Sequence, residues 1–115
     1  MRTFSTSRLG IEQGETILFS DFDVDGVMWT GDGTRQARVR VDLPSGFVEA
    51  PMVTVGLSMW DMSNDANARA DVKTEDVDKD GFTIVFRTWS DTRVARVRVS
   101  WQAIGPVRDD DDWDL

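Results

Sequence analysis

The segment 81–105 constrains the fold more than any other part of this chain. Polar and apolar residues alternate along it in two runs, 82–89 and 94–101, and a polar turn separates the runs. Alternation with a period of two is typical of a strand that packs one face and exposes the other. The segment therefore predicts two strands joined by a turn, with Trp89 at the mouth of that turn.

Further runs of this kind predict strands at 15–22, 36–43, 52–60 and 68–74, and a weaker pattern surrounds Ile11. Segments rich in glycine, proline and aspartate separate the runs, and we find no convincing helical period. Short strands spaced by turns indicate an all-β fold, an antiparallel sandwich or barrel. A chain of 115 residues has the size of one domain.

The composition argues against several classes of function. Twenty-one acidic residues against thirteen basic ones give a net charge of −8, so nucleic acid or an anionic membrane is not the expected partner. Cysteine, histidine and tyrosine are absent, which removes thiol nucleophiles, Cys/His zinc sites and the commonest general base. The spacing of the acids singles out no catalytic pair. We therefore expect a protein that is not an enzyme and has no cofactor.

The chain shows no segment that would target it to a membrane. No apolar run reaches the length of a membrane span, and residues 1–10 are too polar for a signal peptide. We therefore expect no membrane insertion. The localisation stays open, and it includes an extracellular position or a cell or particle surface reached by a non-classical route.

Two acidic strings have the spacing of a calcium loop. The first contains Asp21, Asp23 and Asp25 and has Asp32 at its twelfth position. However, aspartate replaces the usual glutamate there, and the preceding residues have a strand pattern. The second string ends at Gly81 and has an arginine at the twelfth position, which is incompatible with a cation. Turn chemistry explains both strings better than a metal site, and calcium at the first string is the alternative.

Arginines recur on the polar faces of two expected strands. An anion-binding strip is one interpretation of this pattern. Ion pairs with Asp42, Asp71 or Glu75, across strands or subunits, agree better with the net negative charge. The arginines concerned are Arg38, Arg40, Arg96 and Arg98.

The tryptophans have different expected roles. Trp101 shares the apolar face of its strand, so we expect it in the core. Trp60 adjoins a loop and could line an interface. Trp89 ends its strand at a polar turn, where an indole could either stack on the apolar face of a sugar ring or pack internally.

Several spaced motifs together resemble the H-type lectin family, which includes snail agglutinins and the C-terminal domains of discoidins. The resemblance covers residues 29–105. Its motifs are A-P-M-V at 50–53, W-D at 60–61 followed by N-x-R at 67–69, G-F at 81–82, T-W-x-D-T-R-V at 88–94 and S-W-x-A-I at 100–104.

The resemblance implies a six-stranded antiparallel β-sandwich that assembles as a homotrimer, sometimes stacked into a hexamer. It implies binding of galactose- or N-acetylgalactosamine-type glycans in clefts between subunits. By similarity, Asp32 and Arg69 of one subunit and Trp89 and Ser90 of the next would contact the sugar. The chain would then divide into an N-terminal arm and connector at 1–28, the lectin-like sandwich at 29–105 and an acidic tail at 106–115.

Two positions depart from the family pattern. Snail-type sites carry a histidine at the position of Ser90 and an aromatic residue at the position of Ala95, so this chain has less apolar surface there. Glycan binding is the first hypothesis. A structural or interaction module that keeps the fold and the trimer without a sugar site is the second, and a calcium-binding adhesin is the third.

Overall fold

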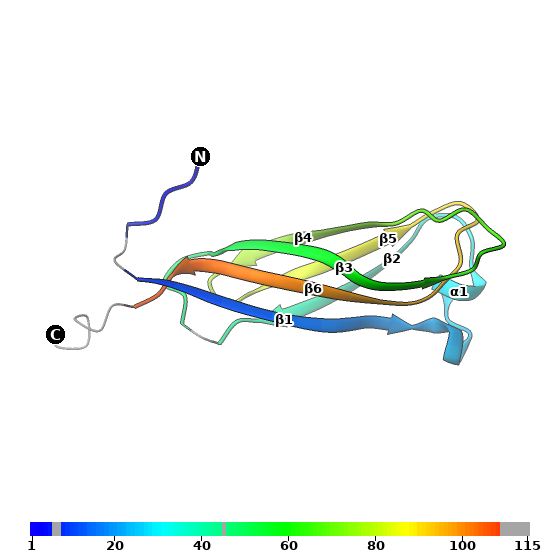
Figure 1. The fold of residues 1–115 in the computed structure, drawn as a ribbon, viewed down its shortest axis with the longest axis horizontal. Coiled ribbons are helices and arrows are strands. Elements are labelled where there is room, and N and C mark those ends of the chain that lie inside the picture. Colours follow the sequence, from blue (N-terminus) through cyan, green and yellow to red (C-terminus); the bar gives the residue numbers. More distant parts are fainter. Residues whose placement is uncertain (6–7, 45, 109–115) are drawn as a thin grey trace.

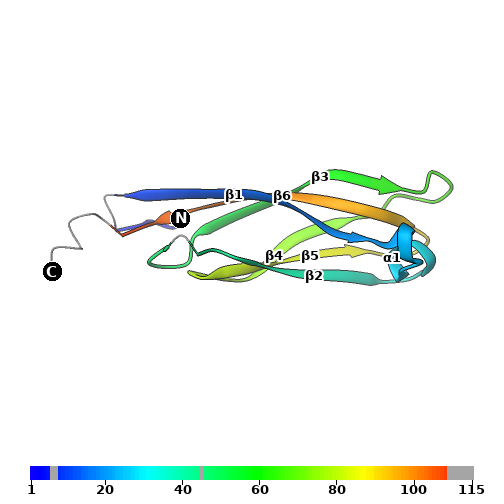
Figure 2. The same cartoon turned by 90° about the horizontal axis from the view of Figure 1, so that it is seen from below.

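The computed structural model describes residues 1–5, 8–44 and 46–108. Six strands pair antiparallel into two three-stranded sheets, with the orders β1-β6-β3 and β2-β5-β4, and the sheets stack face to face (Figures 1 and 2). The prediction of a six-stranded antiparallel β-sandwich is confirmed. The strands are β1 (Leu9–Ser20), β2 (Arg35–Asp42), β3 (Met52–Met62), β4 (Asp71–Asp78), β5 (Gly81–Thr88) and β6 (Val94–Pro106).

The first strand differs from its prediction. The weak pattern around Ile11 and residues 15–20 of the expected run 15–22 form one strand, β1, which pairs with β6 along its length and has an irregularity between Ile17 and Phe19. The strand ends at Ser20 because the next residues turn. They form a short 3-10 helix, η1 (Asp21–Val24), followed by one turn of α-helix, α1 (Val27–Thr30). Neither segment shows a helical period because each is about one turn long.

The inward faces of the two sheets form a core in two adjoining clusters. Phe82 and Phe86 of β5 are fully buried, one in each cluster. Trp101 packs edge-on against Phe82 with ring centroids 5.3 Å apart, as expected of a core residue. Burying each large apolar side chain contributes about 1.5–3 kcal/mol, so this layer holds the sheets together. The buried members are Leu43, Phe47, Phe82, Ile84, Val99 and Ala103, and Met28, Phe86, Val94 and Val97.

The outward face of β2-β5-β4 carries a ladder of ion pairs. Arg38 lies 2.7 Å from Glu75, and Arg40 lies 3.1 Å from Asp78. The hydrogen bond from Arg38, helped by Lys73, lowers the pKa of the Glu75 carboxyl from its ordinary value. These arginines therefore form intramolecular ion pairs, and Glu75 is the partner that the sequence suggested.

None of the helices in the described ranges is long and apolar enough to cross a membrane. Residues 109–115, which make up most of the expected acidic tail, lie outside the described residues.

Candidate functional site

Three segments meet at the end of the sandwich opposite the first residues of β1 and the last residues of β6 (Figure 1). One is the loop 31–34, which follows α1. The second is the segment 63–70, which connects β3 to β4. The third is the turn 89–93, which connects β5 to β6. All four residues that the resemblance nominated lie on these segments, so a single chain brings them to the same end.

Asp32 lies on the first segment, between two glycines. Its side chain is exposed, and within the described residues its carboxylate makes no hydrogen bond or ion pair. Gly33 has a φ of 71°, a left-handed conformation that favours glycine. The N–H of Gly33 donates to the carbonyl of Ser90 at 2.9 Å, so the loop that carries Asp32 is attached to the turn that carries Trp89.

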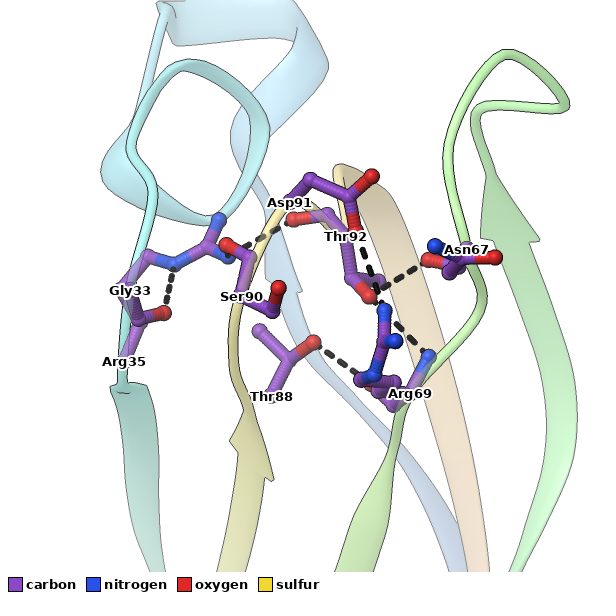
Figure 3. Close-up of polar contacts among 8 residues, drawn as sticks. All are labelled: Gly33, Arg35, Asn67, Arg69, Thr88, Ser90, Asp91 and Thr92. Carbon is purple, nitrogen blue, oxygen red and sulfur yellow. Dashed lines mark hydrogen bonds and ion pairs between the residues drawn. The ribbon is translucent and has the colours of Figure 1, made fainter.

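Arg69 lies on the second segment, where threonine hydroxyls fix its backbone (Figure 3). Thr88 Oγ1 donates to the carbonyl of Arg69 at 2.5 Å, and the N–H of Arg69 donates to Thr92 Oγ1 at 3.1 Å. Thr92 Oγ1 in turn donates to the carbonyl of Asn67 at 2.5 Å. Both threonines are buried, so these bonds lie in a water-poor environment where they are strong.

The threonine bonds also correct a strand boundary. The run 68–74 was expected to be a strand, yet β4 starts only at Asp71. The N–H and C=O of Arg69 bond to threonine side chains rather than to a neighbouring strand. A backbone group that has already found a side-chain partner does not join the ladder.

The guanidinium of Arg69 already has a partner. Its Nη1 lies 3.1 Å from Oδ1 of Asp91, on the turn between β5 and β6 (Figure 3). Both side chains are partly exposed, and an ion pair of this kind contributes little to stability. The pair does hold Arg69 close to the turn that carries Trp89 and Ser90.

Trp89 and Ser90 open the third segment. Trp89 is half-buried, and the guanidinium carbon of Arg87 lies 5.4 Å from the ring centroid. Ser90 is exposed and has a φ of 61°, a left-handed conformation that is strained for a residue with a Cβ atom. Such strain persists only where the surroundings hold the backbone.

The first acidic string is a hydrogen-bonded turn. Asp21 Oδ2 accepts the N–H of Met28 at 2.9 Å, and Asp23 Oδ2 accepts the hydroxyl of Ser20 at 2.7 Å. A Cβ atom on Gly26 would lie 2.3 Å from the Asp21 carboxyl carbon, so glycine is needed for the close approach. In the described part of the chain, no three acidic, histidine or cysteine side chains could together hold a metal ion.

Sequence reasoning assigned no role to the four residues that build this end of the sandwich, Arg35, Thr88, Asp91 and Thr92, although the last three lie in the motif at 88–94. The strand register contains a signal for two of these residues, Arg35 and Thr88. Arg35 shares the inward face of β2 with Ala37, Val39 and Val41, and Thr88 shares the inward face of β5 with Phe82 and Phe86. A polar residue in register with a core face is unusual, and it indicates a defined hydrogen-bonding role.

Comparison with known proteins decides the family. The model of the H-type lectin domain matches residues 38–104, which is more than half of the chain. The chain belongs to the H-type lectin family. The resemblance inferred from the motifs is therefore confirmed.

Two kinds of relative accompany this H-type lectin domain. A protein of Fuscovulum blasticum named ATP synthase subunits region ORF 7 is 55% identical over 107 residues, covering 93% of each chain. Solved structures of discoidin II from Dictyostelium discoideum, one recombinant and one wild-type, have TM-scores of 0.75 and 0.74 at 23% identity. They cover 91% and 90% of this chain, but only 40% and 39% of the discoidin chain. At this identity the discoidin likeness shows the shared fold.

Proposed function

We propose that this protein is a non-catalytic lectin that binds galactose- or N-acetylgalactosamine-type glycans multivalently, in clefts between the subunits of a homotrimer. One observation carries the proposal. Asp32 presents an exposed carboxylate without an internal partner among the described residues, on a loop that is hydrogen-bonded to the Trp89–Ser90 turn. An acceptor held in this way can bind the hydroxyl groups of a ligand without first breaking an internal bond.

The side chains at this end supply the three interactions that a sugar needs. Asp32 accepts hydrogen bonds from a pair of neighbouring hydroxyls, and Arg69 donates to an adjacent oxygen. The pair with Asp91 leaves other N–H donors of the Arg69 guanidinium available. Trp89 of the neighbouring subunit offers an indole for the apolar face of the ring. Charge-assisted bonds depend on geometry, so they select between epimers.

The outward face of β1-β6-β3 supports assembly into a homotrimer. It exposes large apolar side chains, with Ile11 at 65%, Leu9 at 59%, Ile17 at 55% and Met52 at 47% exposure. Exposed apolar groups on one face support an interaction surface, and the ion pairs of Arg98 with Glu15 and of Arg96 with Asp61 share this face. Gly56 lies on this sheet in the interior of β3, and a Cβ atom there would meet nothing within 4 Å. Glycine inside a strand often marks the approach of another chain.

Trimerisation is part of the proposed mechanism. A monosaccharide buries little area, so each site binds weakly on its own. Three identical sites that meet a repeated glycan gain affinity through their effective concentration. The hexamer, formed by two stacked trimers, would extend the same principle.

A second candidate is a structural or interaction module that keeps the fold and the trimer without binding sugar. The ion pair between Arg69 and Asp91 favours this reading, because it engages one of the proposed sugar ligands. The serine at position 90 and the buried alanine at position 95 favour it further, because neither offers much apolar surface to a ligand.

A glycan array probed with the purified oligomer, followed by calorimetry on the best ligand, tests the proposal. Asp32→Asn keeps the shape of the side chain and removes its charge. We expect it to lower affinity by about tenfold or more, since a charge-assisted hydrogen bond contributes roughly 1.5–3 kcal/mol. Asp65→Asn is the matched control, since Asp65 is an exposed acid in the loop between β3 and β4. If an intact trimer binds no glycan, the structural module is the better function.

A further inference from the structure

The strongest unassigned feature of the molecule is a buried cation beneath the candidate site. Arg35 starts β2 with its side chain on the inward face and is 8% exposed. Among the described residues it is the only buried charged side chain, and none of its hydrogen bonds goes to a carboxylate. A buried charge is tolerated only where its donors are satisfied. Its partners therefore reveal its role.

All of those partners are backbone carbonyls, and they come from three separate segments. The first is α1, through the carbonyls of its first two residues, Val27 and Met28; the carbonyl of Val27 also accepts the N–H of Gly31. The second is the loop that carries Asp32. The third is the turn that carries Trp89 and Ser90 (Figure 3). Nε donates to Gly33 at 2.9 Å, Nη1 to Gly31 at 3.1 Å, Met28 at 3.2 Å and Val27 at 3.3 Å, and Nη2 to Thr92 at 2.7 Å and Ser90 at 3.2 Å.

The guanidinium suits this arrangement because it is planar and rigid. Its donors point in fixed directions, so the acceptors on the loop and on the turn are set at fixed positions relative to each other. The carbonyl of Ser90 is shared, since it also accepts the N–H of Gly33 at 2.9 Å. Ser90, whose backbone is left-handed, therefore has two donors on its carbonyl, one from the loop and one from the guanidinium.

We propose that Arg35 is a positioning residue for the sugar site, which holds the Asp32 loop at a fixed place against the turn that carries Trp89 and Ser90. The inference rests on the proposed function, and Arg35 itself touches no sugar. Without the guanidinium, a loop of sequence Gly-Asp-Gly would sample many conformations. Affinity would then fall in proportion to the fraction of molecules in the competent one.

Arg35→Lys, compared with Arg40→Lys, tests the proposal. Lysine keeps the charge but offers a single ammonium in place of the fork. Arg40 lies on the same strand with its side chain on the outward face, paired with Asp78. For Arg35→Lys we expect amide hydrogen exchange at Gly33 to accelerate by about tenfold or more, with the β2–β5 ladder unchanged, and glycan affinity to fall by about tenfold. Arg40→Lys should change neither quantity.

The exchange measurement needs no sugar, so it separates this proposal from the proposed function. Selective acceleration at Gly33 in a protein that binds no glycan would support positioning by Arg35 and refute the lectin function. Uniform acceleration along β2 and β5 would show that Arg35 serves only general stability. Unchanged exchange at Gly33 would likewise overturn the proposal.

A measurement on the unsubstituted protein covers the case in which Arg35→Lys does not fold. The Arg35 Nη protons should exchange slowly in nuclear magnetic resonance spectra, with couplings across the hydrogen bonds to the carbonyls of Ser90 and Thr92. Fast exchange with free rotation of the guanidinium would overturn the proposal.

Discussion

The two sheets share one core, but their outward faces differ. On β2-β5-β4 the outward side chains are arginines and carboxylates that pair with one another, such as Arg38 with Glu75. On β1-β6-β3 the outward side chains include Ile11 and Ile17, which are more than half exposed, beside the ion pairs of Arg98 with Glu15 and of Arg96 with Asp61. The first face is satisfied in water. The second leaves apolar surface uncovered, so a period of two in the sequence does not by itself show that the outward face of a strand is polar.

Placing a charge on the apolar face should have the largest effect on this contrast. We expect Ile11→Asp or Ile17→Asp to dissociate the proposed trimer at micromolar concentration, since its interface would lose three isoleucines at about 1.5–3 kcal/mol apiece. Analytical ultracentrifugation measures the change. Thr83→Asp adds the same charge to the opposite face, at a position paired with Arg40 and Glu75, and should leave the mass unchanged. Equal dissociation by both kinds of variant would remove the distinction between the faces.

Two glycines of the β1-β6-β3 sheet separate an effect on assembly from an effect on the stability of the fold. Gly56→Leu should leave the stability of the monomer nearly unchanged, because a Cβ atom there meets nothing within 4 Å, yet it should weaken assembly by about tenfold or more. At Gly14 a Cβ atom would lie 2.7 Å from the indole of Trp101, so Gly14→Ala should destabilise the fold itself. Thermal unfolding and sedimentation separate the two effects. Unaltered assembly in Gly56→Leu would argue against a partner on this face.

The smallest effect concerns pH and the charged face. The pKa of Glu75 is lowered mainly by the hydrogen bond from Arg38. The stabilisation of the folded state by this hydrogen bond is therefore fully present above the pKa of an unfolded glutamate. It is lost as the pH falls through the lowered pKa of Glu75 in the folded state. We expect Glu75→Gln to reduce stability slightly at neutral pH and to be indistinguishable from the parent protein in strong acid. Urea unfolding at several pH values checks this. A loss that persists in acid would point to packing instead of the ion pair.

Sequence patterns predicted the strands best where one face packs and the other meets water. Arg38 and Arg40 alternate with the apolar residues of β2, and this made the strand easy to recognise. The start of β4 could not be predicted, because it depends on the hydroxyls of Thr88 and Thr92, which lie about 20 residues farther along the chain. The two short helices before β2 could not be predicted from periodicity. Each is too short to show a periodic apolar face, and the Asp21 carboxylate stabilises the segment by accepting the N–H of Met28.

The candidate site was predictable only through the resemblance to a family. Nothing in the local sequence distinguishes Asp32 from the other turn aspartates, because the lack of a partner for its carboxylate among the described residues is a property of the folded chain. The sequence does contain a signal for Arg35, since this residue is in register with the inward residues of its strand. Arginine is normally a surface residue, so this register could be interpreted only once the carbonyl partners of Arg35 were located.

The left-handed backbone at Ser90 has an evolutionary consequence. Its carbonyl accepts two hydrogen bonds, and its side chain takes part in neither. Glycine, asparagine, aspartate and histidine all adopt the left-handed conformation readily, whereas β-branched residues do not. A single codon change at this position can therefore exchange a hydroxyl for an amide or an imidazole without moving the main chain, and in the proposed lectin such a change would alter the sugar site while the architecture stays constant.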